Sequence, residues 1–273
     1  MKTLYLDLGM GAAGDMLTGA LLELMPDREA ALEQLNHLGL PHTQFSMERG
    51  SKCGISGTHI HVTVLGQEEQ PCQDVPQHEH HHAHEHEHDH GHHHDHSPGH
   101  HHSHTAMADI RQTVQALSVS DAVKAQVLGV YERIAQAESQ VHGVPVDQIH
   151  FHEVGSLDAL ADITAVCYLL EQLAPEKIVA SPVQVGYGKI RCAHGILPVP
   201  APATAQILLG IPIRAGDIPG ELCTPTGAAL LRQFVTAYGV LPTMTVNAIG
   251  YGLGTKDFPA ANCLRAMLGE SEA

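Results

Sequence analysis

The sequence predicts a mixed α/β fold with a disordered histidine-rich insertion. Segments with strand-like alternation are followed by segments with helical spacing along most of the chain. Apolar residues make up 43% of the 273 residues, which is enough for a packed core. One segment holds most of the histidines and almost no apolar residue. Strands that alternate with helices are typical of sheets covered by helices.

The histidine-rich segment divides the chain. Sixteen of the 24 histidines lie between His78 and His104, interleaved with Glu and Asp residues. Such a segment cannot bury enough apolar surface to fold, so we expect it to be disordered without metal. The expected organisation is an N-terminal α/β part with a Gly-rich turn, a disordered metal-binding segment and a main α/β part, covering residues 1–66, 67–107 and 108–273.

The N-terminal part is expected to form a strand, two helices and a pair of strands. Leucines at helical spacing follow the Gly-rich turn, where Asp15 is placed to cap the first helix. In the last segment Ile60 and Val62 alternate with His59 and His61, so the apolar side chains face inward. The expected elements are a strand over 3–8, helices over 16–25 and 29–38, and strands over 44–48 and 57–65.

The main part continues the alternation. Val127, Val130, Ile134 and Val141 lie on one face of a long helical segment. Ser156 is placed to cap the next helix, which ends before a proline. The expected elements are helices over 109–117, 121–141, 157–173, 204–209 and 227–238, and strands over 149–153, 177–185, 211–213 and 262–268.

Composition excludes two classes of partner. The net charge of −16 argues against a nucleic-acid backbone. No apolar run approaches the ~18–20 residues of a membrane span, and the N-terminus carries no signal peptide. The six cysteines lie far apart without a C-x-x-C motif, which is typical of reduced thiols. We therefore expect a soluble, cytoplasmic protein that binds neither nucleic acid nor membrane.

The histidine-rich segment is a candidate metal-binding site. Neutral imidazole is a ligand for Ni²⁺, Zn²⁺ and Cu²⁺, and the neighbouring carboxylates add negative charge. A flexible run with many overlapping sites suits capture and storage, but it cannot fix one catalytic geometry. An accidental or tag-like polar tract is the alternative. The candidate ligands are His80, His82, His84, His86, His88, His90, His92, His93, His94 and His96.

A Gly-rich turn follows the first strand. Gly9, Gly11 and Gly14 match the pattern G-x-G-x-x-G, in which backbone N–H groups and a helix N-terminus hold a phosphate. A dinucleotide-binding fold is disfavoured, because a second helix and a hairpin follow and no acidic residue ends a second parallel strand. Two alternatives remain. The turn and Asp15 form a cradle for a phosphate or mononucleotide, or the glycines allow close packing.

The densest cluster of ligand-type residues outside the histidine-rich segment runs from His150 to Asp162. His150 and His152 share one face of an extended segment that leads into Glu153, and Asp158 and Asp162 are one helical turn apart. These side chains could meet at the turn to hold a metal or act in catalysis. The alternative is a pair of hydrogen-bonded histidines beside a capped helix.

Two further motifs carry candidate residues. Cys192 and His194 could share a metal or form an acid–base pair, although buried cysteine is also common in cores. Thr224, Thr226 and Gly227 indicate a helix start with threonine caps and N–H groups that suit an anion. An ordinary capped helix is the alternative there.

Together these motifs resemble the nickel insertion protein family of lactate racemase maturation (LarC), the nickel chelatases of nickel-pincer cofactor synthesis. They occur in order along the chain, and the histidine-rich segment lies where the family usually carries one. The matching motifs are Tyr5-Leu6-Asp7, Gly14-Asp15-Met16, His150-Phe151-His152-Glu153-Val154-Gly155, Cys192-Ala193-His194-Gly195, Leu197-Pro198-Val199-Pro200-Ala201-Pro202 and Thr224-Pro225-Thr226-Gly227.

The resemblance implies insertion of Ni²⁺ into pyridinium-3,5-bisthiocarboxylic acid mononucleotide, with nickel–sulfur and nickel–carbon bonds formed at the expense of CTP. For this activity the candidate catalytic residues are His150, His152, Glu153, Asp158 and His194. The candidate substrate-binding residues are Gly9, Gly11, Gly14, Asp15, Thr224, Thr226 and Gly227. The candidate metal ligands are His150, His152, Asp162 and the ten histidines named above.

The chain departs from the family in length. Family members are longer, and their C-terminal part is associated with CTP and its divalent metal, so we expect this chain to be the nickel- and substrate-handling N-terminal part. The expected partners are the C-terminal part of the same gene product, lactate racemase or another nickel-pincer enzyme as recipient, and further copies of the chain in a homo-oligomer. The alternative function is a nickel storage or delivery metallochaperone without catalysis.

Overall fold

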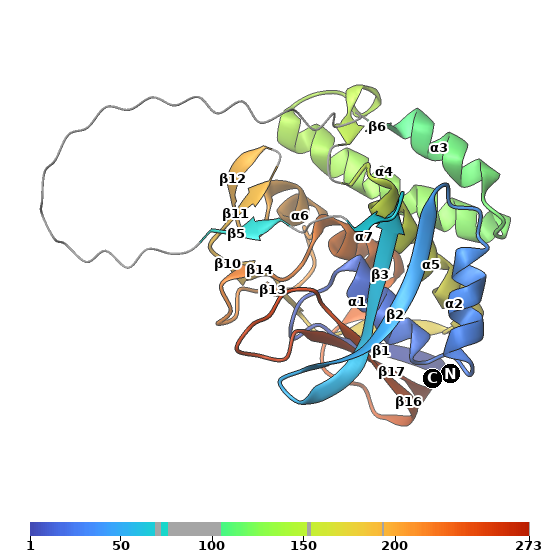
Figure 1. Ribbon diagram of the computed structural model, residues 1–273. Coiled ribbons are helices and arrows are strands. Elements are labelled where there is room, and N and C mark those ends of the chain that lie inside the picture. The colour runs from blue at the N-terminus through green and yellow to red at the C-terminus, as the bar shows by residue number, and fades with distance from the viewer. Residues whose placement is uncertain (69–71, 76–104, 152–153, 193, 273) are drawn as a thin grey trace, which may run out of the picture.

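The computed structural model describes residues 1–68, 72–75, 105–151, 154–192 and 194–272, and it confirms the mixed α/β class (Figure 1). The helices are α1 Gly14–Leu22, α2 Arg28–Asn36, α3 Met107–Ala116, α4 Asp121–His142, α5 Leu157–Leu173, α6 Pro202–Ile207, α7 Pro225–Phe234 and the 3-10 helix η1 Val146–Gln148. The longer strands are β1 Lys2–Asp7, β2 Thr43–Lys52, β3 Ile55–Val64, β8 Lys177–Ala180, β11 Lys189–Cys192, β12 Gly195–Pro198, β16 Met244–Leu253 and β17 Cys263–Ser271. The two-residue strands are β4 Gln67–Glu68, β5 Gln73–Asp74, β6 Thr105–Ala106, β7 His150–Phe151, β9 Val183–Gln184, β10 Gly186–Tyr187, β13 Ile213–Arg214, β14 Gly220–Glu221 and β15 Ala237–Tyr238.

One large mixed sheet organises the described residues. Its strand order is β15-β8-β1-β17-β16-β3-β2, with β4 paired to β3. β1 runs parallel to β8 and antiparallel to β17. The first strand of the chain therefore lies between two strands from its last hundred residues, and the segments on both sides of the histidine-rich segment share one sheet.

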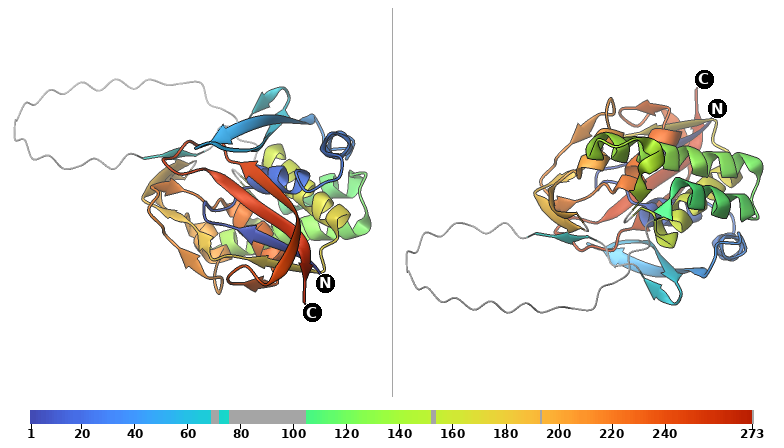
Figure 2. Two further views of the ribbon diagram at one scale, coloured as in Figure 1. Left: turned by 90° about the horizontal axis from the view of Figure 1, so that it is seen from below. Right: turned by 90° about the horizontal axis from the view of Figure 1, so that it is seen from above.

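The helices cover one face of this sheet. The strands lie in front when the molecule is seen from below, and α3 and α4 lie in front when it is seen from above (Figure 2). The main core packs Leu4 and Leu6 of β1 against side chains of α1, α5 and α7. On the opposite face, the described residues form a small cluster of Tyr5, Val179 and Met267. Successive side chains of a strand point to opposite faces, so β1 contributes to both clusters.

Local signals placed the long helices correctly. Val127, Val130 and Ile134 of α4 are fully buried, as their spacing predicts. Val141 continues the same face in the last turn of α4, where it is 40% exposed. Ser156 caps α5, as predicted, since its Oγ accepts a hydrogen bond from the Ala159 N–H at 3.2 Å.

The strand β16 is missing from the sequence prediction. It carries Gly250 and Gly252, and glycine is depleted in strands. A Cβ at Gly250 would overlap the Ala20 carbonyl of α1, and a Cβ at Gly252 would overlap the Met16 carbonyl. The two glycines therefore let α1 lie directly on the backbone of β16, which brings the start of α1 to its place in the site.

Other predicted elements are present with shifted boundaries. The strand expected over 177–185 is interrupted by Ser181 and Pro182, and it forms β8 and β9. The short strands β10, β11, β12 and β14 are absent from the prediction, because they contain too few residues for a periodic pattern. Within the described residues, no helix is both long and apolar enough to cross a membrane. None of the six cysteines forms a disulfide.

Candidate functional site

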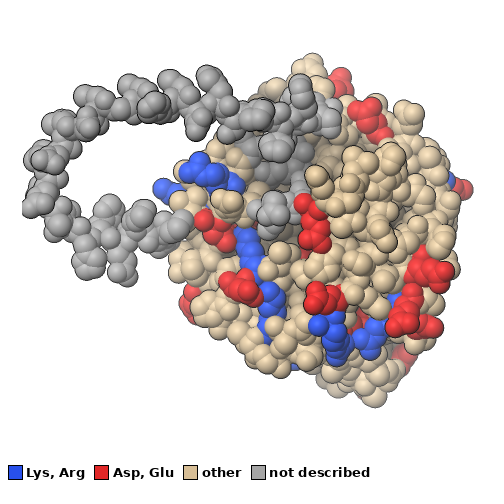
Figure 3. All heavy atoms as spheres, viewed as in Figure 1, with Lys and Arg blue, Asp and Glu red and all other residues tan. Residues whose placement is uncertain are grey.

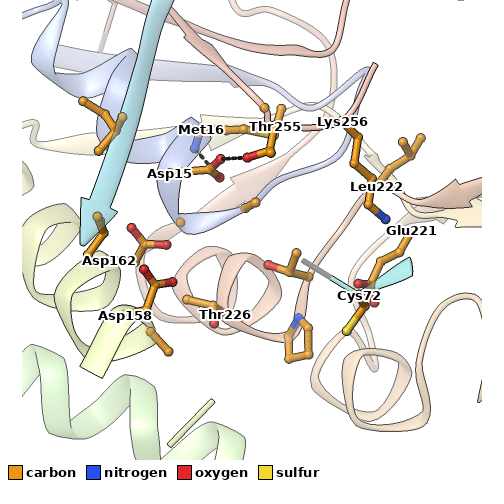
Figure 4. A pocket seen from close by; sticks show the side chains of 18 of the residues that line it. Asp15, Met16, Cys72, Asp158, Asp162, Glu221, Leu222, Thr226, Thr255 and Lys256 are labelled. Atoms are coloured by element: carbon orange, nitrogen blue, oxygen red, sulfur yellow. Dashed lines mark hydrogen bonds between the residues drawn. The ribbon is translucent and has the colours of Figure 1, made fainter. Parts of the chain in front are cut away.

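A cavity of about 630 Å³ is lined by residues from segments far apart in the sequence (Figure 4). The starts of α1, α5 and α7 border it, together with β3, the end of β11 and the loop that follows β16. Helix N-termini carry a partial positive charge, so carboxylates in their first turns are stabilised there. The cavity is the place where the separate sequence motifs meet.

The Gly-rich turn reaches this cavity only at its end. Gly14 and Asp15 line the cavity, whereas Gly9 and Gly11 do not. Gly11 has a φ of +80°, and a Cβ there would overlap the carbonyl oxygen of Leu222. The Ala12 N–H donates to the same carbonyl at 3.0 Å. Of the two alternatives for the Gly-rich turn, a phosphate cradle or close packing, close packing against the backbone of Leu222 explains why Gly11 is a glycine.

Gly11→Ala is expected to destabilise the fold strongly. The new methyl group meets backbone and the residue keeps a left-handed conformation, so we expect a loss of about 3 kcal/mol or more. Gly54→Ala is the matched control, because Gly54 has a φ of +81° and open space around it. Urea unfolding followed by circular dichroism measures both variants. Equal losses would contradict the packing role of Gly11.

Asp15 lies in the first turn of α1 and not at its N-cap. The prediction of a capping role is wrong, because Ala13 is the N-cap. The Asp15 Oδ1 accepts from the Met16 N–H at 2.8 Å, and the Thr255 hydroxyl donates to Oδ2 at 3.4 Å. Burial raises the pKa of Asp15 to about 6, and these hydrogen bonds oppose the rise.

Asp15→Asn is expected to stabilise the protein at neutral pH. The unfolded carboxyl ionises near pH 4, whereas the folded one keeps its proton until about pH 6, so wild-type stability falls as the pH rises through this window. We expect the variant to gain up to about 2 kcal/mol at pH 7 and nothing below pH 4. Melting temperatures of the wild type and the variant, measured between about pH 4 and pH 7, test this prediction. Asp121→Asn, in the first turn of α4, is the control. A stability difference between Asp15→Asn and the wild type that does not change with pH would contradict the raised pKa of Asp15.

The motif from His150 to Asp162 is only partly assembled at the cavity. Asp158 and Asp162 line it from the first turns of α5, and Figure 4 shows them side by side. A Cβ at Gly14 would overlap the Asp162 carboxylate, so glycine leaves room for this group. His150 is exposed on β7 and does not line the cavity.

The start of α7 has the predicted form. The Thr224 Oγ1 accepts from the Gly227 N–H at 3.1 Å, so Thr224 caps the helix. Thr224 and Thr226 line the cavity. Gly227 lies behind them, where a Cβ would overlap the carbonyl oxygen of Ala12. The first turn of α7 contains no acidic residue, in contrast to those of α1 and α5.

Of Cys192 and His194, only Cys192 lines the cavity. Cys192 ends β11 and lines the cavity. His194 lies in the turn before β12, and its ring centroid is 5.0 Å from that of His142 at the end of α4. A joint role of the two residues inside the cavity therefore stays a prediction.

The sequence prediction missed two histidines at the cavity. His59 and His61 of β3 line it, with ring centroids 4.3 Å apart. The Nδ1 of His61 lies 2.6 Å from the Glu68 carboxylate. Burial, and then the neighbouring His61, lower the pKa of His59, so its neutral, ligating form is favoured. The sequence signal that could have revealed this pair is two histidines, two residues apart, in a predicted strand, because such side chains lie on the same face.

Two cations at the cavity were also missed. Arg191 and Lys256 line it, and the Lys256 Nζ lies 3.0 Å from the Asp74 carboxylate. Lys and Arg side chains lie beside Asp and Glu side chains on the face shown in Figure 3. The lining contains these two cations against five carboxylates, which are Asp15, Glu68, Asp158, Asp162 and Glu221. The cavity therefore attracts cations.

Several predicted ligands lie outside the described residues. These are His152 and the ten candidate histidines of the histidine-rich segment, and the candidate catalytic residue Glu153 lies outside them as well. Among the residues that the structure describes, no group of three or more His, Cys, Asp or Glu side chains has the geometry of a metal site. The described carboxylates and imidazoles thus surround the cavity without forming a complete set of metal ligands.

The fold and site define an α/β protein with a cavity that attracts cations and has the size of a small-ligand site. The sequence model of the family described as "Nickel insertion protein" matches residues 4–273. The chain belongs to this family.

Curated relatives carry a more specific name. Proteins of Geobacillus kaustophilus, Clostridium acetobutylicum and Desulfitobacterium hafniense (strain DCB-2) are named pyridinium-3,5-bisthiocarboxylic acid mononucleotide nickel insertion proteins. They are 38%, 42% and 38% identical to this chain over 99%, 100% and 99% of its length. The chain spans 60%, 65% and 59% of their lengths. No solved structure matches the chain.

Proposed function

We propose that this chain handles nickel and substrate during nickel insertion into pyridinium-3,5-bisthiocarboxylic acid mononucleotide. Nickel–sulfur and nickel–carbon bonds form in this reaction, and the cavity is where metal and substrate meet. The observation that carries the proposal is the convergence of Asp15, Asp158 and Asp162 on one cavity in a member of the nickel insertion family. The relatives' names supply the substrate.

The chemistry of the substrate matches the charges of the cavity. A pyridinium ring and Ni²⁺ are both positive, so both are stabilised by the carboxylate-rich wall at the starts of α1 and α5. The nucleotide phosphate is negative, and we assign it to the cavity wall that carries Arg191 and Lys256. The start of α7 also lines the cavity and has no acidic first-turn residue. The start of α1 is less favourable for phosphate, because the Asp15 carboxyl lies there.

The remaining roles follow the resemblance. His150, His152 and Glu153 are proposed to take part in metal transfer, and the histidine-rich segment is proposed to collect nickel. The CTP-dependent step is proposed to need the C-terminal part, since the chain spans only about 60% of its relatives. A nickel-pincer enzyme such as lactate racemase is the proposed recipient of the product, in the cytoplasm.

The test is an insertion assay with the chain supplemented by the C-terminal part of a relative. Mononucleotide, Ni²⁺ and CTP are added, and mass spectrometry follows the nucleotide. The expected result is a product that has gained one nickel atom, formed only when this chain is present. Nickel binding by the chain with no binding of the mononucleotide and no product would overturn the proposal in favour of nickel storage.

A further inference from the structure

Cys72 immediately precedes β5, Cys192 ends the neighbouring strand β11, and both line the cavity wall. β5 and β11 pair antiparallel, with Asp74 opposite Ile190 and Gln73 opposite Arg191. Continuing this register by one residue places Cys72 opposite Cys192. Both cysteines line the cavity. Their side chains therefore lie at the same wall.

The hydrogen bonds of the two strands bring these side chains close together. The Val75 N–H donates to the Lys189 carbonyl at 2.9 Å, so these residues form a hydrogen-bonded pair. Pairs alternate along an antiparallel ladder, so a ladder continued to Cys72 and Cys192 would reach one of the narrow backbone positions. At such positions the Cα atoms are about 4.5 Å apart and the side chains approach most closely. Two thiols at this spacing can bind one metal ion.

The other four cysteines have different surroundings. Cys167 and Cys223 are completely buried, and burial raises the pKa of both thiols, so they are poor ligands. Cys53 and Cys263 do not line the cavity. Figure 4 shows Cys72 beside Glu221 on the wall near Lys256. Lys256 favours the thiolate and the Glu221 carboxylate opposes it, so the main force that removes the thiol protons is the binding of Ni²⁺ itself.

We propose that Cys72 and Cys192 form a dithiolate site that holds Ni²⁺ and passes it to the sulfur atoms of the substrate. Thiolates are the soft ligands of proteins, and a bisthiocarboxylic acid offers two more sulfur donors. This inference rests on the proposed function.

The transfer is a ligand exchange without oxidation or reduction. Each thiol releases a proton when Ni²⁺ binds. Two nickel–sulfur bonds to Cys72 and Cys192 then break, and two nickel–sulfur bonds to the substrate form. The thiolates take up protons from solvent, and nickel remains divalent throughout. Because donors of the same kind replace one another, nickel need not pass through free solution.

Absorption spectroscopy of the reduced full chain tests the metal site without substrate. Nickel bound by thiolate gives charge-transfer absorption in the near ultraviolet, which imidazole-bound nickel lacks. We expect a band in the wild type whose intensity at saturating nickel corresponds to about one thiolate-bound nickel per chain, and its loss in Cys72→Ser and Cys192→Ser. The matched control Cys53→Ser/Cys263→Ser should keep the band. A band that persists in Cys72→Ser/Cys192→Ser, or is absent from the wild type, overturns the site.

The insertion assay then tests the transfer. With one equivalent of nickel, Cys72→Ser/Cys192→Ser should insert nickel about 10–100-fold more slowly than the control, and excess nickel should reduce the difference. Loss of the band with unchanged insertion would overturn the transfer role. A wild type that shows the band but inserts no nickel would overturn the proposed function and leave the dithiolate site supported. Circular dichroism confirms that each variant is folded.

Discussion

Deletion of residues 77–104 is expected to remove most of the nickel ions that the chain binds. The deletion takes away 16 of the 24 histidines, and neutral imidazole binds Ni²⁺ well. The flanking strands β5 and β6 are not part of the large sheet, so the α/β core should stay folded. Calorimetric titration with Ni²⁺ measures the stoichiometry, and thermal unfolding checks the core.

A second variant tests whether the loss of nickel comes from the missing histidines or from the shortened chain. Replacing the 16 histidines by serine keeps the number of residues, and it should lose the same nickel ions as the deletion. Equal stoichiometry in the wild type and in both variants would show that the histidine-rich segment does not store nickel. The other eight histidines would then have to supply the sites.

Asp158→Asn is expected to slow nickel insertion by about 10–100-fold. Asp158 faces the cavity from the first turn of α5, where its carboxylate can bind or orient the cationic reactants. Asparagine keeps the size of the side chain and removes the charge. The measurement is the insertion assay with the C-terminal part present and nickel in excess.

Asp121→Asn is the matched control for this variant. Asp121 also lies in the first turn of a long helix, but it is exposed and outside the cavity. Both variants lose a similar interaction with the helix dipole, about 0.3–1 kcal/mol, so any stability effect should be shared. An insertion rate of Asp158→Asn equal to that of Asp121→Asn would assign Asp158 a structural role only.

The sequence predicted those parts of the fold that local signals determine. Ser156 and the apolar spacing that follows it gave both ends of α5 correctly. Thr224 marked the start of α7 in the same way. The strand order could not be predicted, because the position of β1 between β8 and β17 depends on contacts across nearly the whole chain. β16 was missed because the glycines that fit it to α1 weaken its strand signal.

The same distinction holds for the site. Gly14, Asp15, Asp158 and Thr226 were found, because each belongs to a recognisable turn or helix start. The pairing of β5 with β11 and the return of the loop after β16 bring in Cys72, Arg191 and Lys256. No local pattern marks those residues, since their chemistry arises only when distant segments meet. His150 is exposed on β7 outside this lining, and its predicted role in metal transfer stays a prediction.

Nickel and the mononucleotide are expected to meet in the cavity between the α5 carboxylates and the cations Arg191 and Lys256. Anomalous diffraction at the nickel edge, from crystals soaked with Ni²⁺ and the mononucleotide, tests it most directly. The expected result is an anomalous peak inside the cavity, at bonding distance from the substrate sulfur atoms, with the phosphate toward Arg191 and Lys256. A fully occupied mononucleotide bound elsewhere, with nickel found only at sites outside the cavity, would contradict the claim.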